Sequence, residues 1–228
     1  RDGGKDMILG AIKNPSHHRL LAGNLNGATL HYEKIIVASA KHTPQFAGKS
    51  IAELAEHWAL RPEEAFLEIL AVNELAVTIF SETINEKNME TIYRQPYAYF
   101  ASDGIGYEAP GNTAESTGNL VHPRSFGASA RFLADMVRNK SLLSWEDAIS
   151  KMTLAPALLL RLRDNRGTLQ EDAPADITLF DPATITDNAT YEHPFQYPTG
   201  IPWVLVGGKV AVANNELTQV RSGTILQA

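Results

Sequence analysis

The chain has 228 residues, no cysteine and a formal net charge of -6. The lack of cysteine excludes disulfides and thiolate metal ligands from these residues. A negative net charge without clustered Lys or Arg argues against nucleic acid or an anionic membrane surface as the partner, and favours a small molecule.

The sequence shows neither a membrane span nor a signal peptide. No apolar run reaches the roughly 18 to 20 residues of a transmembrane helix, and the first residues lack the apolar segment of a secretory signal. We therefore expect a cytoplasmic protein. The chain starts at Arg1, without Met and within a helical pattern, which indicates a fragment or a processed product.

The N-terminal part predicts helices with clear start signals. Residues 5–22 predict two short helices, with Pro15 in the first position of the second. Residues 27–40 predict a strand or paired short strands. Ser50-Ile-Ala-Glu53 is a capping box that opens a helix through Trp58, and Arg61-Pro62-Glu63-Glu64 opens the next helix.

The centre of the chain predicts a strand, a helix and a second strand. Residues 75–80 are a continuous apolar run, Asn85 caps a helix that reaches Arg94, and residues 97–102 form another apolar, aromatic run. Strands joined by a helix in this way form βαβ units, whose strands pair in parallel and are buried on both faces. The sequence therefore predicts an α/β fold with a parallel sheet.

The second predicted strand ends at Asp103-Gly104, and a long polar loop over residues 105–125 follows. Enzymes of the α/β class place catalytic groups at the carboxyl ends of buried strands, and long loops are often functional. Asp103 is therefore the first candidate for a catalytic residue, and His122 and Arg124 are candidates from the loop. Since Asp-Gly is also a common turn pair, a purely structural turn is the alternative.

The C-terminal part predicts helices followed by a small β module. Residues 128–139 predict a helix, Ser144-Trp-Glu-Asp147 is a second capping box, and residues 153–160 continue as helix. Beyond Arg166 the pattern turns alternating and Pro-rich. Gly207-Gly208 between two β-rich runs predicts a hairpin.

Several motifs together resemble one family. They are Ser102-Asp103-Gly104, His122-Pro-Arg124-Ser-Phe-Gly127, Ala148-Ile-Ser-Lys151-Met-Thr153-Leu-Ala-Pro156-Ala, Ala175-Asp176-Ile-Thr-Leu-Phe-Asp181-Pro and Trp203-Val-Leu-Val-Gly-Gly-Lys209. This set resembles the C-terminal half of the N-acyl-D-amino-acid deacylases, or D-aminoacylases, of the amidohydrolase superfamily. The similarity spans nearly the whole chain and is densest from Tyr97 onward.

The resemblance implies the C-terminal part of a (β/α)8 TIM-barrel amidohydrolase. Residues 1–47 would then be a segment of an inserted subdomain, residues 48–166 the last two barrel units, and residues 167–228 a segment of a small β-sandwich. The earlier barrel strands, which carry the metal-binding histidines of the family, would lie outside this chain.

The resemblance also implies an activity, the metal-dependent hydrolysis of N-acyl-D-amino acids to a carboxylate and a free D-amino acid. A zinc ion activates water, and Asp103 takes the water's proton and delivers it to the leaving amine. Asp103 is also a candidate metal ligand, together with ligands outside this chain. Arg124 matches the position that binds the substrate's carboxylate, and His122 would orient the loop or touch the substrate. A structural ion pair is the alternative for Arg124.

A self-contained zinc site is not expected in this chain. Its sequence has no His-x-His or His-x3-His pair, and His31, His42, His57 and His193 lie in unrelated settings. Zinc is therefore expected for the complete enzyme, whereas this chain alone is expected to bind none and to be inactive.

Two other functions remain open. The first alternative to the deacylase is a truncated, catalytically incomplete module with a structural or interaction role. The second is a hydrolase of cyclic amides, like the dihydropyrimidinases. Two parallel strands without neighbours would expose strand edges and an apolar face. We therefore expect the chain to pair with the missing N-terminal barrel half or to associate with itself through those strands.

Overall fold

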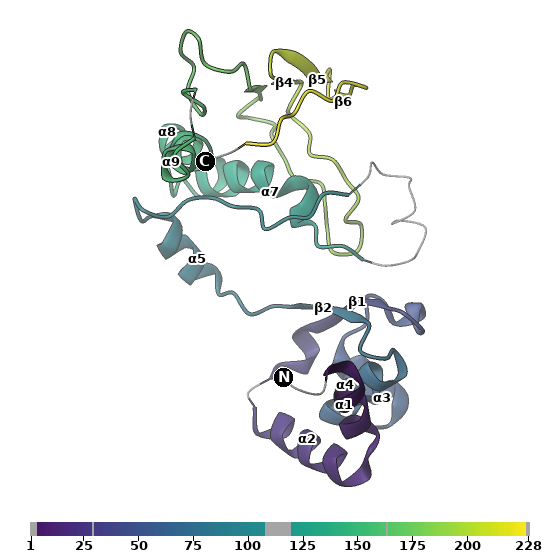
Figure 1. Cartoon of the computed structure of the whole chain (residues 1–228). Coiled ribbons are helices and arrows are strands. Elements are labelled where there is room, and N and C mark those ends of the chain that lie inside the picture. The colour runs from purple at the N-terminus through teal and green to yellow at the C-terminus, as the bar shows by residue number, and fades with distance from the viewer. Residues whose placement is uncertain (1–3, 29, 108–119, 163, 227–228) are drawn as a thin grey trace. The chain divides into compact units, whose positions relative to one another are not determined.

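The computed structural model describes residues 4–28, 30–107, 120–162 and 164–226. The chain divides into two compact units (Figure 1). Unit 1 comprises Arg1–Thr83 and Tyr107–His122, and unit 2 comprises Ile84–Gly106 and Pro123–Ala228. Among the described residues, no helix combines the length and the apolar character that a membrane crossing requires.

Unit 1 begins with two helices, as predicted. They are α1 (Gly4–Lys13) and α2 (Pro15–Gly27). Between them the side chain of Asn14 accepts hydrogen bonds from the backbone N–H groups of Ser16 and His17, at 3.0 and 3.2 Å. Asn14 thereby pairs donors that a helix start leaves without intrahelical partners.

The next two helices also start where the sequence predicts. α3 (Ile51–Trp58) opens with a complete capping box, because the Glu53 N–H donates to Ser50 Oγ and the Ser50 N–H donates to the Glu53 carboxylate. α4 (Pro62–Val72) has Pro62 in its first turn.

The sheet of unit 1 pairs β1 (Ile35–Ala40) with β2 (Val77–Ser81), and the pairing is antiparallel. The short turns η1 (Tyr32–Lys34) and η2 (Pro44–Phe46) flank β1. β1 contributes buried side chains to the core, whereas those of β2 are half-buried or exposed. The larger core cluster among the described residues of unit 1 consists of Ile35, Val37, Ala40, Ile51, Leu54, Ala55, Ala65 and Ile69, and a smaller cluster joins Ile12, Ala22 and Leu67.

The prediction of a parallel βαβ unit is wrong. α5 (Glu86–Tyr93) forms, with Asn85 as its cap, but residues 97–102 form no strand and run as irregular chain. β2 pairs with β1 and not with this segment. A strand needs a neighbour to pair with, and here the Phe100 N–H donates instead to the carbonyl of Lys151. The described residues are thus a mixed α/β structure in which no barrel closes.

The helices of unit 2 carry its core. α7 (Arg124–Leu133) continues into the π-helical turn η3 (Ala134–Asn139), and α8 (Trp145–Met152) and α9 (Leu154–Leu159) follow. The predicted helix over residues 128–139 is confirmed, and it begins earlier, at Arg124. The core residues are Ala130, Phe132, Leu133, Met136, Val137, Leu142, Ala148 and Ile185.

Two arginines bind α7 and η3 to the segment that follows β3. Arg131 Nε lies 2.8 Å from Asp187 Oδ2, and Arg138 Nη1 donates to the carbonyl of Ile185 at 2.6 Å. The approach is close at Gly127, where a Cβ would lie only 1.7 Å from Asp187 Oδ1. Glycine at this position therefore permits the contact between the helix and the segment.

The predicted β module is an antiparallel sheet with the strand order β3-β4-β5-β6; β4, β5 and β6 are labelled in Figure 1. The strands are β3 (Ile177–Leu179), β4 (Trp203–Val206), β5 (Lys209–Ala213) and β6 (Glu216–Leu217). Gly207 and Gly208, with φ of +55° and +75°, connect β4 to β5, which confirms the hairpin. The predicted boundaries after residues 47 and 166 differ from those of the compact units and stay predictions.

Candidate functional site

Asp103 lies in the irregular segment after α5, and its side chain is 82% exposed. Its φ of +50° is in the left-handed region, which is unfavourable for a residue with a Cβ. The next residue is confined, because a Cβ on Gly104 would lie 3.0 Å from the Cα of Ser125 and 3.2 Å from the carbonyl of Arg124. Glycine thus lets the turn approach the first residues of α7.

Side chains at the start of α7 hold this turn. Arg124 Nη2 lies 2.8 Å from Asp103 Oδ2, and the Ile105 N–H donates to Ser125 Oγ at 3.2 Å. Inside the turn, the Gly104 N–H donates to Ser102 Oγ at 3.2 Å. The structure therefore brings together two residues, Asp103 and Arg124, that the sequence suggested separately.

The pair of Asp103 and Arg124 is exposed, so it contributes little to stability. The Arg124 side chain is 42% exposed, and ion pairs of this kind contribute about 0 to 1 kcal/mol. Arg124 is the first residue of α7, where the helix dipole disfavours a cation and favours a carboxylate. The carboxylate of Asp103 compensates for the positive charge of the arginine at this position.

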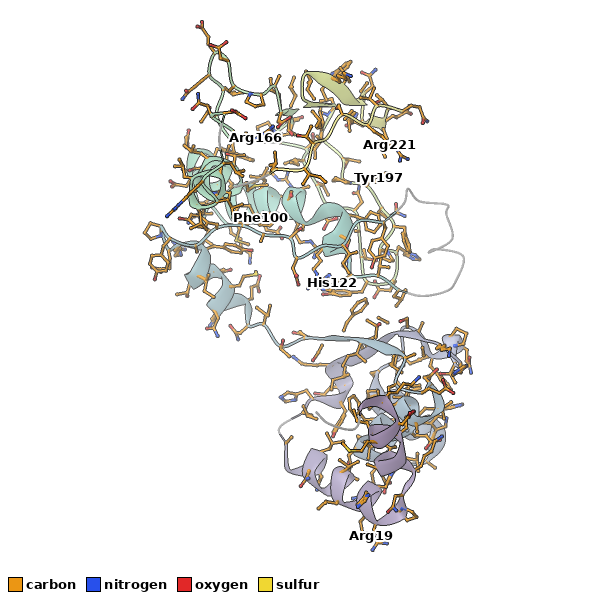
Figure 2. All side chains as sticks on the ribbon, viewed as in Figure 1. Arg19, Phe100, His122, Arg166, Tyr197 and Arg221 are labelled. Atoms are coloured by element: carbon orange, nitrogen blue, oxygen red, sulfur yellow. The ribbon has the colours of Figure 1, made fainter. Side chains whose placement is uncertain are left out.

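His122 belongs to unit 1, whereas Asp103 and Arg124 belong to unit 2. Its ring contacts the ring of Phe80 in β2 edge-on, with 5.4 Å between the ring centroids (His122 is labelled in Figure 2). The contact places His122 against an aromatic side chain of its own unit. Residues 108–119 of the predicted polar loop lie outside the described residues.

The described residues do not by themselves make a zinc site. Zn²⁺ in proteins takes three or four nitrogen, sulfur or oxygen ligands. Within the ranges that the structure describes, no three His, Cys, Asp or Glu side chains converge. The partner at Asp103 is a guanidinium group, which is a cation and not a metal ligand.

A hollow of about 580 Å³ lies in unit 1 and is lined by residues that include Lys41, Pro44 and Thr78. It contains none of the predicted site residues.

Sequence reasoning missed two residues that hold this region. One is Ser125, which binds the backbone beside Asp103. The other is Lys151, which is buried and binds the backbone before Asp103. Both lie in the motifs quoted above, but a serine at a helix start and a lysine in a helix have no local signature of such contacts.

Comparison with known sequences finds one family and several relatives. A model of the amidohydrolase family matches residues 115–212. The chain is 29% identical over 193 residues to the N-acyl-D-aspartate deacylase of Alcaligenes xylosoxydans xylosoxydans. This match covers 85% of this chain and 36% of the relative. It is 32% identical over 184 residues to the N-acyl-D-glutamate deacylase of the same organism, with 81% and 34% covered.

Solved structures of the same kind are also similar. One is an N-acyl-D-glutamate deacylase from Bordetella bronchiseptica, complexed with zinc and a phosphonate inhibitor that mimics the tetrahedral intermediate. It matches with a TM-score of 0.66 and 29% sequence identity, and the match covers 79% of this chain and 35% of that chain. A crystal structure of D-aminoacylase matches with a TM-score of 0.71 at 28% identity over 85% and 38%. The chain thus spans about a third of the length of these relatives, and the resemblance drawn from the motifs is confirmed.

Proposed function

We propose that this chain, which belongs to the amidohydrolase family and is homologous to the N-acyl-D-amino-acid deacylases, is the C-terminal portion of a metal-dependent enzyme that hydrolyses N-acyl-D-amino acids. The observation that carries the proposal is the contact between Asp103 and Arg124. It joins a carboxylate suited to proton transfer with a guanidinium suited to an anionic substrate.

The short distance between the two groups fits the shape of such a substrate. In an N-acyl amino acid, the carboxylate and the amide nitrogen are bonded to the same carbon atom. A group that binds the carboxylate and a group that protonates the amide nitrogen must therefore lie close together. Arg124 Nη2, at the start of α7, lies 2.8 Å from Asp103 Oδ2, which supports these roles.

The roles of Asp103 and Arg124 follow from this arrangement. Without substrate, Arg124 binds Asp103. The substrate's carboxylate then takes the guanidinium group in a bidentate contact, which is stronger than an exposed ion pair. Asp103 is released to accept a proton from the attacking water and to donate it to the leaving amine. We also propose His122 as a residue that contacts the substrate.

The metal of this proposal comes from the relatives. Zinc is bound in the structure of the N-acyl-D-glutamate deacylase. We place its histidine ligands in the complete protein, outside the described residues, and Asp103 is the residue of this chain that we assign to the metal.

The test is the Asp103→Asn variant of the complete protein, assayed for release of D-amino acid from N-acetyl-D-amino acids. We expect hydrolysis to be lost while the zinc content, measured by mass spectrometry, stays largely intact, because the proposed histidine ligands remain. The matched control is Asp172→Asn, because Asp172 is also exposed and in the left-handed region, with φ of +64°. Full activity of Asp103→Asn would refute the assignment.

A second candidate, an interaction module, is favoured by the end of α9. Leu158, Leu159 and Leu160 are consecutive there and are 68%, 63% and 56% exposed. Exposed apolar surface of this kind often marks a contact with another chain, here a second copy. Sedimentation velocity of the wild-type chain and of a Leu159→Ser variant tests this function, which a monomeric wild-type chain would contradict.

A further inference from the structure

Lys151 is one of the few charged residues that the structure buries. It lies in the last turn of α8 and is 7% exposed. Burial of an ammonium group is unfavourable by several kcal/mol unless hydrogen bonds or opposite charges compensate. Among the described residues, no carboxylate forms an ion pair with Lys151, so the compensation comes from elsewhere.

The compensation comes from the backbone of the segment that leads to Asp103. Lys151 Nζ donates to the carbonyl of Gln95, and to that of Ala98 at 2.8 Å. The carbonyl of Lys151 itself accepts from the Phe100 N–H at 3.1 Å. The end of a helix also favours a cation, because the helix dipole is negative there. A single residue thus forms the bonds that strand neighbours would form with residues 95–100.

The segment is held at a second place before it reaches the site. The ring of Phe100, labelled in Figure 2, packs on the ring of Phe132 in α7, with 4.8 Å between the ring centroids. A few residues later, Asp103 contacts Arg124 and Ile105 contacts Ser125. The segment that carries Asp103 is therefore held on both sides. Lys151 and Phe132 hold the residues before Asp103, and the start of α7 holds Asp103 itself and Ile105.

We propose that Lys151 is a positioning residue for Asp103. Its ammonium group fixes residues 95–100 so that the following turn brings Asp103 to Arg124. That this position of Asp103 serves catalysis rests on the proposed function. An ammonium group suits this role because it has three donors and no acceptor. A methionine of similar length fills the same space but leaves the carbonyls of Gln95 and Ala98 without their donor.

The first experiment compares nuclear magnetic resonance spectra of the 228-residue chain with those of Lys151→Met. We expect hydrogen exchange of the Phe100 amide to become at least about tenfold faster, since its segment loses two hydrogen bonds. We also expect the amide resonances of Gly104 and Ile105 to move, although neither residue touches Lys151. The matched control is Lys209→Met, which removes an exposed lysine from β5 and should leave these signals unchanged.

The signals of Phe100 report the local contacts of Lys151, whereas those of Gly104 and Ile105 report the position of the turn at Asp103. A change that reaches Phe100 but leaves Gly104 and Ile105 unchanged would overturn the proposal, because Lys151 would then hold only its own contacts. Unchanged spectra in Lys151→Met would overturn it as well. These signals need no hydrolysis, so their outcome is independent of the Asp103→Asn assay that tests the proposed function.

Chemical rescue shows whether the ammonium group itself is needed. The chain has no cysteine, so Lys151→Cys introduces a single thiol. In the unfolded chain the thiolate displaces bromide from 2-bromoethylamine, and the new S–C bond gives a side chain close to lysine in length and charge. Reaction with 1-iodopropane gives a side chain of nearly the same shape without the charge.

After refolding, we expect the aminoethyl group to restore the Gly104 and Ile105 resonances and the propyl group to leave them displaced. Wild-type chain taken through the same steps controls for refolding. Restoration by both groups would overturn the proposal, because volume alone would then suffice. Restoration by neither, in a chain whose β4–β5 hairpin gives native signals, would also overturn it.

Discussion

The guanidinium group of Arg124 lies 2.8 Å from the carboxylate of Asp103, a residue distant from it in the sequence. Both groups are exposed, so the contact adds little to stability. Its main effect is to hold a carboxylate and a guanidinium group next to each other on the surface of unit 2. The carboxylate of the proposed substrate would take the place of Asp103 on Arg124. We therefore expect replacement of Arg124 to affect mainly KM and replacement of Asp103 to affect mainly kcat.

Replacement of Arg124 by lysine should weaken substrate binding more than it slows the chemical step. Lysine keeps the charge but loses the planar, bidentate geometry of the guanidinium group. In the complete protein we expect Arg124→Lys to raise KM for N-acetyl-D-amino acids about tenfold, which corresponds to ~1.4 kcal/mol, with a smaller change in kcat.

Steady-state kinetics of Arg124→Lys and of Arg166→Lys check this expectation. Arg166 also forms an ion pair with an aspartate, Asp176, and neither residue belongs to the proposed site, so its variant should leave KM unchanged. A loss of kcat in Arg124→Lys at constant KM would contradict a role in binding the carboxylate.

Close packing at Gly127 should make this position intolerant of a side chain. A Cβ there would lie 1.7 Å from Asp187 Oδ1, so α7 or the segment around Asp187 has to move. We expect Gly127→Ala to lower the free energy of unfolding by about 1 to 3 kcal/mol, as measured by urea denaturation.

The matched control is Gly10→Ala in α1. A Cβ on Gly10 would meet nothing within 4 Å, and alanine is favoured over glycine inside a helix by about 0.5 to 1 kcal/mol. Gly10→Ala should therefore stabilise the chain. Equal effects of the two substitutions would show that helix propensity, and not the contact with Asp187, decides the outcome at Gly127.

Local signals in the sequence predicted much of this structure. The caps at Ser50 and Asn85 and the hairpin at Gly207-Gly208 were predicted correctly, because the groups that form each hydrogen bond or turn lie within a few residues of one another. The predicted strand over residues 97–102 failed for the opposite reason. An apolar run becomes a strand only where neighbours offer it hydrogen bonds, and here Lys151 binds its backbone.

The site was predictable only in its residue types. The motifs pointed to Asp103 and Arg124, but no local pattern shows that they touch, since the contact depends on how the turn at Asp103 packs on the first residues of α7. Lys151 was missed for a related reason. A lysine near the end of a helix usually lies in solvent, and its burial depends on the segment after α5 that covers it.

The capping box of α3 predicts a dependence of stability on pH. The Ser50 N–H donates to the Glu53 carboxylate, and this bond, followed by that of the Ser50 side chain, lowers the pKa of Glu53 below its ordinary value. A group with a lowered pKa stabilises the folded state above its unfolded pKa and loses this contribution as the pH falls through its folded pKa. We expect Glu53→Gln to reduce the loss of stability on acidification.

Urea denaturation between neutral and acidic pH checks this expectation. Glu56→Gln removes an exposed carboxylate from the same helix, outside the capping box, and should leave the slope of stability against pH unchanged in comparison. An identical slope for wild type and Glu53→Gln would contradict a capping role for the Glu53 carboxylate.

The 228-residue chain should bind no zinc in stoichiometric amount. A stable site needs three or four converging ligands, and within the described ranges no such group of His, Asp or Glu exists. After dialysis against zinc and then against metal-free buffer, we expect mass spectrometry to find far less than one ion per chain. The complete protein treated in the same way should retain its metal, since the proposed histidine ligands lie there. One zinc ion per isolated chain, lost in Asp103→Ala but not in Asp172→Ala, would contradict the claim that the ligands lie elsewhere and would place a metal site on the turn at Asp103.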